Sequence, residues 1–407
     1  MKIAGITAEY NPFHNGHKNH IAVTKKGIMT ENIFIIMSGN FTQRGEPAII
    51  DKYQRTYCAL KNGADIVAEL PCVFASSGAE FFASAAVKMF NDSGICTHIS
   101  FGAETDDIEK LKKNAAFLEN EDPYFKKLIA ENMTKGISFP SAREIAMKEI
   151  LGEEPLISTP NNILACEYIK TLISLNSSII PFAVKRKGND YNQTELSGKL
   201  SSASAIRNSI ENGKIEDIIS SVPEETYSVL ISEISKGKAP INFNSLSHIL
   251  NYKIRSLSTE ELALFHGVTE GLENKIKRSV DTAYNAHDIA MTIKSKRYTL
   301  SRIQRFLLHM CLDIKNEDLL RYKQNGYSPY IRILGFRKEK EFLLKEIAKK
   351  SSIPVIVNIK NAHKTLDNMG MEILGKEIYA DNIYYSLCPN KKFAYTNQDF
   401  TTPVVII

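Results

Sequence analysis

The stretch KIAGITAEYNPFHNGHKNH, residues 2–20, combines a strand pattern, a turn and a helix pattern. Its first part, KIAGITAEY (2–10), is an apolar run typical of a buried strand, and the residues after the turn have the composition of a helix. The turn region holds three of the chain's nine histidines, His14, His17 and His20. In open parallel sheets, ligands bind where a strand ends and a helix begins, because free N–H groups and the helix dipole face that point. The stretch therefore predicts a nucleotide or anion site in an α/β fold.

The first half of the chain continues this alternation of strands and helices. Apolar runs predict further strands at residues 32–39, 64–71, 97–104 and 178–186, with amphipathic stretches between them. Such alternation is typical of a parallel sheet with helices on both faces, and so of a Rossmann-like α/β domain.

The second half has a different pattern. From about residue 215 to 350 it predicts helix after helix, followed by one strand-like run at 353–359 and a tail of strand or loop from Asp381. We therefore expect a Rossmann-like α/β domain over residues 1–212 and a mainly α-helical, basic domain over residues 213–407.

Composition narrows the class of protein. The chain has 407 residues, of which 43% are hydrophobic and 24% charged, as in ordinary globular proteins. It has no signal-peptide pattern and no run of eighteen apolar residues, so no membrane partner is expected. Its six cysteines are scattered without a CxxC pair. This usage favours a reducing, cytoplasmic location and no zinc or other metal cluster.

Basic residues are concentrated in one segment. Residues 271–350 hold 18 Lys and Arg against 9 Asp and Glu, whereas the whole chain has a net charge of only +5. This concentration predicts a partner that carries phosphates, most simply RNA, with no expectation of DNA. The alternative is a solvated helical surface.

The His-x-Gly-His pattern has a physical rationale at this place. His14 and His17 are compact donors that can hydrogen-bond phosphate oxygens and stabilise charge on a transferring adenylyl group. Gly16 has no Cβ, so a flat base could lie against the backbone, and Pro12 stiffens the turn. The alternative is a pair of partly exposed histidines at a helix start, with Asn15 in a plain turn.

A second motif lies about 190 residues further on. Residues 202–207 read Ser-Ala-Ser-Ala-Ile-Arg at a predicted helix start after the last strand. The hydroxyls of Ser202 and Ser204 and the helix N-terminus can hold phosphate oxygens, and Arg207 can neutralise leaving pyrophosphate. The alternative is a serine N-cap on a surface helix.

Together the two motifs resemble the HIGH-motif nucleotidyltransferase superfamily, although Ala203 departs from its common serine–serine–threonine form. Longer strings are similar to one family in it, the tRNA(Met) cytidine acetate ligases. They are GITAEYNPFHNGH (5–17), MSGNFTQRGEPAIIDKYQR (37–55), FGAET (101–105), TPNNILACEY (159–168), KRYTLSRIQR (296–305) and LGFRKEK (334–340).

This resemblance implies an ATP-dependent ligase that activates acetate as acetyl-adenylate and acetylates the wobble cytidine of elongator tRNA(Met). It implies ATP as a substrate and His14, His17 and Arg207 as catalytic residues. Mg²⁺ is expected with the nucleotide from ATP chemistry. The implied ATP-binding residues of the first loop are Thr7, Ala8, Glu9, Tyr10, Asn11, Pro12, Phe13, His14, Asn15, Gly16, His17, Lys18, Asn19 and His20. Further implied ATP contacts are Gly102, Asn162, Arg186, Lys187, Ser202 and Ser204. Alternatively, Gly102 is a simple strand-to-loop turn, Asn162 caps a helix, and Arg186 is an exposed basic strand end.

We also expect particular residues to contact the tRNA and to lie near the acetate. The predicted tRNA contacts are Lys296, Arg297, Tyr298, Arg302 and Arg305. On one helix, Tyr298, Arg302 and Arg305 would share a face; alternatively, Tyr298 packs in the core with the arginines around it. The loop at 38–50, with Gln43, Arg44 and Glu46, is expected to be a lid or tRNA-facing loop near acetate, or a plain surface loop. Glu104 and Asp106 are expected to hold magnesium or ribose, or to cap a helix.

Two other functions fit parts of the sequence. A small-molecule nucleotidyltransferase would share the motifs, but the basic helical half is larger than such compact enzymes need. A non-catalytic nucleotide-binding RNA module would have no need for His14, His17 and Arg207. An aminoacyl-tRNA synthetase is disfavoured because the chain lacks a lysine-rich KMSKS-like loop.

Overall fold

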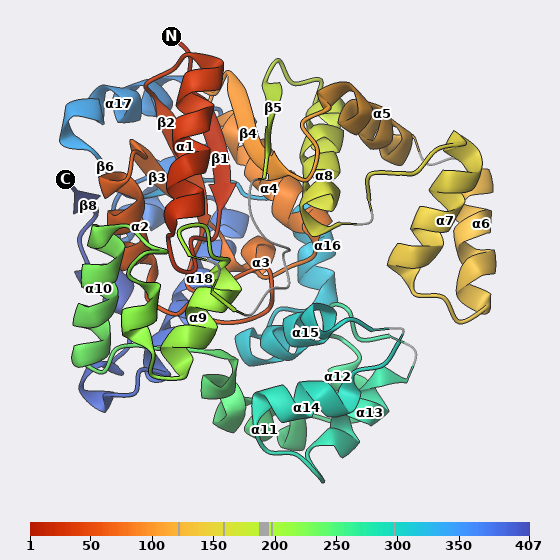
Figure 1. Ribbon diagram of the computed structural model, residues 1–407. Helices are drawn as coiled ribbons and strands as arrows, with labels where there is room; N and C mark the ends of the chain where they lie inside the picture. Colours follow the sequence, from red (N-terminus) through yellow and green to blue (C-terminus); the bar gives the residue numbers. More distant parts are fainter. Residues whose placement is uncertain (121–122, 158, 187–194, 197, 270, 297) are drawn as a thin grey trace.

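Figure 1 shows the computed structural model, which describes residues 1–120, 123–157, 159–186, 195–196, 198–269, 271–296 and 298–407. In the N-terminal half, strands alternate with helices. In chain order the elements are β1 (Ala4–Ala8), α1 (Asn15–Ile28), β2 (Ile33–Ser38), α2 (Lys52–Lys61), β3 (Ile66–Leu70), α3 (Cys72–Ala75), α4 (Ala79–Asp92), β4 (His98–Ala103), α5 (Ile108–Glu119), α6 (Pro123–Thr134), α7 (Phe139–Leu151), α8 (Pro160–Ser174), β5 (Ile180–Lys185) and α9 (Ala203–Glu211).

The C-terminal half is mainly helical and adds three strands. Its longer elements are α10 (Glu224–Ser235), α11 (Ser247–Ser256), α12 (Thr259–Leu262), α13 (Leu272–Ser279), α14 (Ala286–Ile293), α15 (Leu300–Leu312), α16 (Asn316–Gln324), β6 (Ile331–Phe336), α17 (Glu341–Lys350), β7 (Val355–Ile356), α18 (Asn368–Ser386), α19 (Gln398–Thr401) and β8 (Val405–Ile406). Among the described residues, no helix combines the length and the apolar character that crossing a membrane requires.

The strands form one sheet in the order β5-β4-β1-β2-β3-β6-β7, with β8 also paired to β6. The first five strands are parallel to one another, whereas β6 is antiparallel to β3. The chain leaves β1 toward β2 and β3 on one side and returns to β4 and β5 on the other. The topological switch point, where ligands bind in such sheets, therefore lies between β1 and β4.

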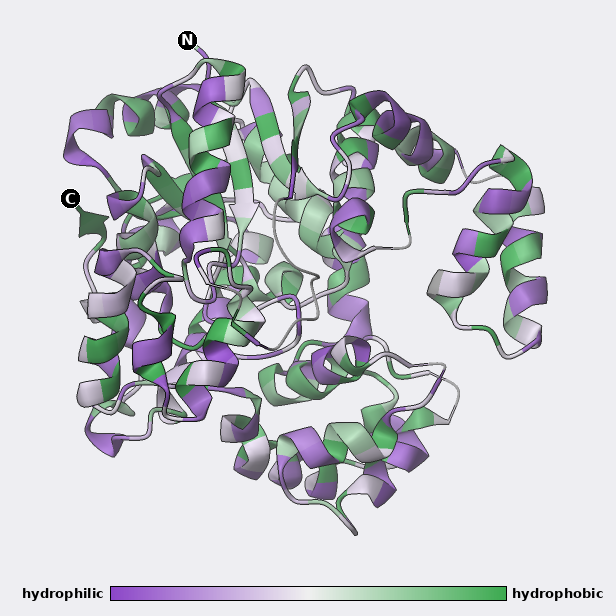
Figure 2. Ribbon diagram, in the orientation of Figure 1, coloured by the Kyte–Doolittle hydropathy of each residue, from purple (hydrophilic) through white to green (hydrophobic). Residues whose placement is uncertain are grey.

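All five strands predicted in the first half are confirmed. The strand β2 is buried at every position, as its run of isoleucine, phenylalanine and methionine predicts for a strand covered on both faces. Peripheral helices such as α10 and α13 differ from this buried strand, because they carry both hydrophilic and hydrophobic bands (Figure 2). The Rossmann-like α/β fold class is thus confirmed, as is the mainly helical second half.

Two local predictions in the second half are wrong. Residues 331–336, expected within a run of helices, form β6, whose partner β3 lies more than 260 residues earlier in the chain. The tail expected from Asp381 as strand or loop instead continues α18 to Ser386, and only after that residue is it mostly loop, with the short α19 and the strand β8. The buried residues of α18 include Glu377 and Asp381, and such polar residues on a buried face hide the helical hydrophobic period. The predicted strand at 353–359 is reduced to Val355–Ile356.

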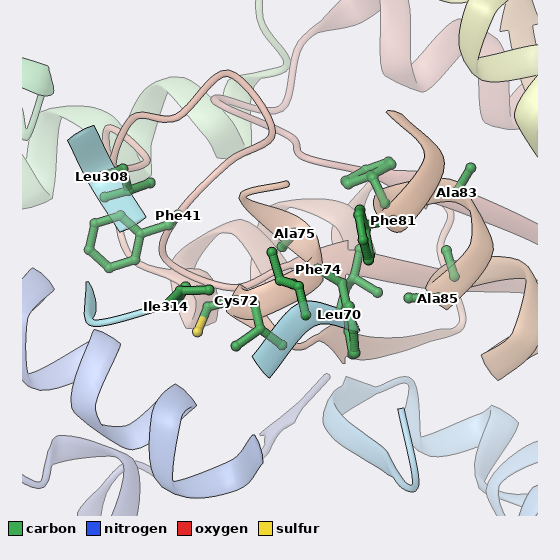
Figure 3. Close-up of a cluster of buried hydrophobic side chains, with 14 of the residues drawn as sticks. Phe41, Leu70, Cys72, Phe74, Ala75, Phe81, Ala83, Ala85, Leu308 and Ile314 are labelled. Carbon is green, nitrogen blue, oxygen red and sulfur yellow. The ribbon is translucent and has the colours of Figure 1, made fainter. Parts of the chain in front are cut away.

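The two halves share a core. In the close-up of Figure 3, Phe41 and Phe74 from the sheet half lie in one buried cluster with Leu308 of α15 and Ile314. The strand β6 also adds the second half to the sheet edge at β3. The division at residue 212 stays a prediction about folding units, and the packing here is continuous across it.

A buried ion cluster also joins the halves. Lys52 of α2 lies 2.7 Å from Glu69 of β3 and 3.1 Å from Asp399 of α19, and it also pairs with Asp381. Arg332 of β6 lies 2.8 Å from both Glu69 and Asp399. Each of these side chains is at most 5% exposed. Because buried charges are stable only when paired, this cluster ties the C-terminal helices to the sheet.

Oxygen atoms of Glu69, Glu377 and Asp381 lie within 4.8 Å of one another, a spacing that metal ligands also show. The ammonium group of Lys52 contacts all three of these carboxylates, so the cluster already contains its cation.

Candidate active site

A cavity of about 270 Å³ opens at the carboxyl ends of β1 and β4, at the switch point of the sheet. Figure 1 shows how α1, α8 and α9 surround this end of the two strands. The predicted residues that line it are Thr7, Ala8, Glu9, Tyr10, Asn11, His14, Gly16, His17, Asn19, His20, Gly102, Arg186, Ser202, Ser204 and Arg207. The two sequence motifs, almost 190 residues apart in the chain, therefore meet in one cavity.

The histidine pair is built into the start of α1. His14 is the N-cap, and its Nδ1 accepts a hydrogen bond from the backbone N–H of Gly16 at 3.0 Å. His17, one turn later, accepts through Nδ1 from the backbone N–H of His14 at 3.2 Å. The rings stack with centroids 3.7 Å apart. Because each Nδ1 is an acceptor, each neutral ring carries its proton on Nε2.

Both imidazoles are neutral at physiological pH. Burial, reinforced by the charges of Arg186 and Arg207, lowers the pKa of His14 to about 3. Burial and the neighbouring His14 hold the pKa of His17 well below its ordinary value. The pair therefore offers two Nε2–H donors, which can bind phosphate oxygens without proton transfer.

His20 has a different environment, further along α1. Its Nε2 lies 3.0 Å from the hydroxyl of Ser100 on β4, and burial lowers its pKa to about 4. It therefore ties α1 to the strand across the switch point.

The second motif forms the N-terminus of α9. Ser202 is the N-cap and accepts from the backbone N–H of Ala205 at 3.1 Å, as the helix-cap reading expected. Arg207 donates to the carbonyl of Asn11 at 2.8 Å and pairs with Glu46 at 2.8 Å. These contacts anchor the guanidinium beside the first loop, where negative phosphates would compete for it.

The β4 side of the cavity carries the other predicted contacts. A Cβ at Gly102 would lie 3.4 Å from Cγ of Arg186, so the bare backbone leaves room beside that arginine. Arg186 donates to Asn161 at 2.9 Å, and Asn161 lines the cavity. Asn162 is buried and accepts from the backbone N–H of Glu104 at 3.0 Å. The structure thus places Asn161 on the wall and Asn162 off it.

Glu104 is engaged in helix capping. Its carboxylate accepts from Thr159, Asn161 and the backbone N–H of Asn162 at 2.6–3.0 Å, which satisfies the N-terminus of α8. The helix-cap alternative therefore describes Glu104, and the neighbouring Asp106 is exposed.

Other predicted positions lie outside the cavity wall. Phe13 is fully buried in the core, and Pro12 is buried beside it. Asn15 donates to the carbonyl of Ser220, and Lys18 is exposed on α1. Lys187 lies outside the described residues.

The cavity also has apolar lining residues, which were not predicted as site residues. This apolar wall consists of Ile6, Phe82, Phe101, Leu164, Tyr168 and Val184. These residues come from strands and from the helices α4 and α8, where aromatic and aliphatic side chains read as ordinary core. Four of them, Ile6, Phe101, Leu164 and Tyr168, lie within the strings that resemble the family, and that resemblance is the sequence signal that could have selected them.

The loop at residues 38–50 is mostly buried, so the surface-loop alternative is wrong. The backbone N–H of Gln43 donates to Glu9 at 2.7 Å, and Arg44 donates to Ser204 at 2.9 Å. On its other side, the carbonyl of Gln43 accepts from Arg305 of α15 at 3.2 Å. The loop thus connects the cavity to the helical half.

The predicted placement of Tyr298 on a helix is wrong. Thr299 is the N-cap of α15, so Tyr298 precedes the helix, and it is buried with the guanidinium of Arg302 4.9 Å from its ring centre. This is the alternative arrangement, a core tyrosine with arginine beside it. Lys296 is exposed, and Arg297 lies outside the described residues.

Fold and site together define a nucleotidyl transferase of the HIGH-motif class, and a family model described as HIGH Nucleotidyl Transferase matches residues 1–399. The chain is 38% identical over 415 residues to a tRNA(Met) cytidine acetate ligase of Acetivibrio thermocellus, with 100% of both chains covered. Two crystal structures of Thermotoga maritima TmcAL, at 32% identity and full coverage of both chains, superpose with TM-scores of 0.96 for the apo form and 0.93 for a form bound with alpha-thio ATP. This chain belongs to the tRNA(Met) cytidine acetate ligase family.

Proposed function

We propose that this protein is an ATP-dependent acetate ligase that acetylates the wobble cytidine of elongator tRNA(Met). Acetate attacks the α-phosphate of ATP, pyrophosphate leaves, and the acetyl group passes from acetyl-adenylate to the exocyclic amine of the cytidine. The observation that carries the proposal is the meeting of the two motifs in one cavity, in a chain similar to these ligases over its full length.

Within the cavity, we assign the phosphates of ATP to the helix starts. The Nε2–H groups of His14 and His17 and the N-terminus of α9 are donors, and Arg207 supplies positive charge. The base would lie against Gly102 and the apolar wall. These assignments follow from donor chemistry and from the space that the cavity leaves.

Magnesium would come with the nucleotide. Glu9 is the single carboxylate among the described residues of the wall, and Glu104 is occupied with its helix cap. The described side chains thus offer no carboxylate pair for the ion. Mg²⁺ is expected to bind phosphate oxygens and water, which is its usual preference, and no step here depends on it.

The basic helical half would bind the tRNA. We propose Lys296, Arg302 and Arg305 as contacts, with Arg297 a candidate on sequence alone. The buried Tyr298 would act by supporting Arg302. All six cysteines are free thiols, which fits the proposed work on tRNA in the cytoplasm.

The test supplies purified protein with labelled ATP, acetate and bulk tRNA, followed by mass spectrometry of the digested nucleosides. Acetylcytidine that requires both ATP and acetate is the expected product. If pyrophosphate exchanges into ATP in the presence of acetate but no acetylcytidine forms, the protein makes acetyl-adenylate and tRNA is not its acceptor. If the exchange requires a phosphorylated metabolite and not acetate, the protein is a small-molecule nucleotidyltransferase.

A further inference from the structure

Glu9 stands apart from the other polar groups of the cavity. It is the single carboxylate among the described lining residues, and the wall also carries the cations Arg44, Lys185, Arg186 and Arg207. Cations suit ATP and acetate, which are both anions, whereas a carboxylate repels both ligands. Binding of the two substrates therefore does not explain Glu9.

The carboxylate is held in place but keeps capacity to accept. Its Oε1 accepts from the backbone N–H of Gln43 at 2.7 Å, and the described residues give it no further hydrogen bond. Arg44 and Glu46 face it from the loop, Arg207 from α9 and Tyr168 from α8. Burial raises the pKa of Glu9, which makes its ionised form a stronger base than an exposed carboxylate.

The two steps of the proposed reaction differ in their need for a base. When acetate attacks the α-phosphate, one P–O bond forms, another breaks, and no proton moves. In the second step, the amine nitrogen forms a C–N bond with the acetyl carbon, the C–O bond to AMP breaks, and the nitrogen loses a proton. The second step alone therefore needs a proton acceptor.

The other groups of the cavity are poor acceptors. His14 and His17 use their Nδ1 lone pairs in the cap of α1 and carry protons on Nε2. His20 is a weak base, because burial lowers its pKa to about 4, and its ring is hydrogen-bonded to the hydroxyl of Ser100. The lysine and arginine side chains are already protonated. Among the described residues of the cavity wall, Glu9 is thus the one carboxylate available for the proton.

We propose that Glu9 is the catalytic base of acetyl transfer, and that it takes the proton from the exocyclic amine as the nitrogen attacks the acetyl carbon. This role rests on the proposed function, since it needs an amine acceptor. It assigns separate groups to the two steps: the histidines and Arg207 to adenylate formation, and Glu9 to transfer.

The test separates these steps in the full-length E9Q variant. Glutamine keeps an oxygen for the N–H of Gln43 but cannot take up a proton at neutral pH. Step one is measured as acetate-dependent exchange of labelled pyrophosphate into ATP. Step two is measured as single-turnover acetylation of tRNA from synthetic acetyl-adenylate, at several pH values.

We expect E9Q to retain acetate-dependent pyrophosphate exchange, which shows that it is folded, with a loss in exchange at least about tenfold smaller than its loss in transfer. Transfer should be slower by about 10²- to 10⁴-fold and should lack the fall in rate on the acid side, where Glu9 is protonated in the wild type. E9A also loses the hydrogen bond with the backbone N–H of Gln43, so it should be impaired in both adenylate formation and acetyl transfer.

Other results overturn the inference. Wild-type transfer by E9Q would assign the proton to the leaving AMP or to water. Equal losses of both steps in E9Q would make Glu9 a charge that only positions Arg44 and Arg207. If the wild type itself showed neither step, the proposed function would fail, and not this role alone.

Discussion

His14 caps a helix and also carries the proposed catalytic donor, and one substitution can separate these two roles. Its Nδ1 caps α1, and its Nε2–H is free to donate into the cavity. Asparagine is among the best N-cap residues, because its side-chain oxygen accepts from the same backbone N–H groups, but it has no donor at the position of Nε2. The H14N variant should therefore keep the helix start and lose the catalytic donor.

We expect H14N to slow acetate-dependent pyrophosphate exchange by about 10²- to 10³-fold, the usual loss for one donor to a transition-state oxygen. Its free energy of unfolding should stay within about 0.5 kcal/mol of wild type, whereas H14A should lose about 1 kcal/mol with its cap. Exchange kinetics and urea unfolding measure the two effects. Wild-type exchange by H14N would remove His14 from the chemistry.

Residues in contiguous motifs could be predicted from the sequence, and residues that reach the site from distant helices could not. His14, His17, Ser202 and Arg207 lie in short runs whose residue types and place after a strand point to phosphate chemistry. Phe82, Leu164 and Tyr168 of the apolar wall come from helix faces that also pack the core, and only the tertiary fold decides which residues of those faces border the cavity.

At the scale of elements, β1 could be predicted from a local sequence pattern, whereas β6 could not. The first five strands are short apolar runs bounded by turn signals, a local pattern. The run IRILGF of β6 is equally apolar, but helical segments flank it and its partner β3 lies in the other half of the chain. Pairing over such a separation has no local signature.

The loop at 38–50 offers a test of how the two halves communicate. Gly45 has φ +83° and packs against α15, where an added Cβ would lie 2.3 Å from the backbone nitrogen of Arg305. The backbone of α15 cannot move without a large cost in free energy, so the added methyl group of G45A should displace the loop from α15. That loop also carries the contacts of Gln43 with Glu9 and of Arg44 with Ser204.

We expect G45A to lose about 1–3 kcal/mol of stability from overpacking, in addition to about 1 kcal/mol of left-handed backbone strain. It should also slow pyrophosphate exchange, because the loop supports the cavity. G152A is the matched control: Gly152 ends α7 with φ +68° and open space around its Cβ position, so it should show the strain alone. Equal stability and wild-type exchange in both variants would refute the coupling.

At the scale of the whole molecule, charge divides the chain. The described residues that line the cavity all come from the sheet half, and α15 lies in the helical half (Figure 1). Lys296 is exposed there, and Arg302 is partly exposed. Binding energy from phosphate contacts depends on salt through counterion release. The tRNA affinity should therefore respond to these two residues separately from adenylate formation.

We expect K296A/R302A to weaken tRNA binding and to lower the slope of log affinity against log salt by about 2, one for each lost phosphate contact. Pyrophosphate exchange without tRNA should be unchanged. The control K345A/K349A removes two charges from α17, far from α15 in Figure 1, and should bind tRNA as wild type does. Filter binding over a salt series measures this, and an unchanged slope in K296A/R302A would place the tRNA elsewhere.

The buried ion cluster that joins the halves makes the stability of the whole molecule depend on pH. Burial and the adjacent carboxylate of Glu69 raise the pKa of Glu377 from its ordinary 4.5 to about 8. The folded protein therefore holds a proton that the unfolded chain releases between these values. The stabilisation is complete below pH 4.5 and is lost as the pH rises toward 8, at about 1.4 kcal/mol per pH unit.

E377Q should remove this dependence, because its amide is neutral at every pH and its oxygen can still accept from the backbone N–H of Cys72. From pH 5.5 to 8 we expect the free energy of unfolding of E377Q to rise relative to wild type by about 1.4 kcal/mol per unit. E372Q on the same helix is the control, since Arg321 lowers the pKa of Glu372 to about 2 and leaves it ionised throughout this range. Its difference from wild type should stay constant with pH. Urea unfolding at each pH measures both, and parallel curves for wild type and E377Q would mean that Glu377 is ionised within the cluster, with Lys52 and Arg332 neutralising it.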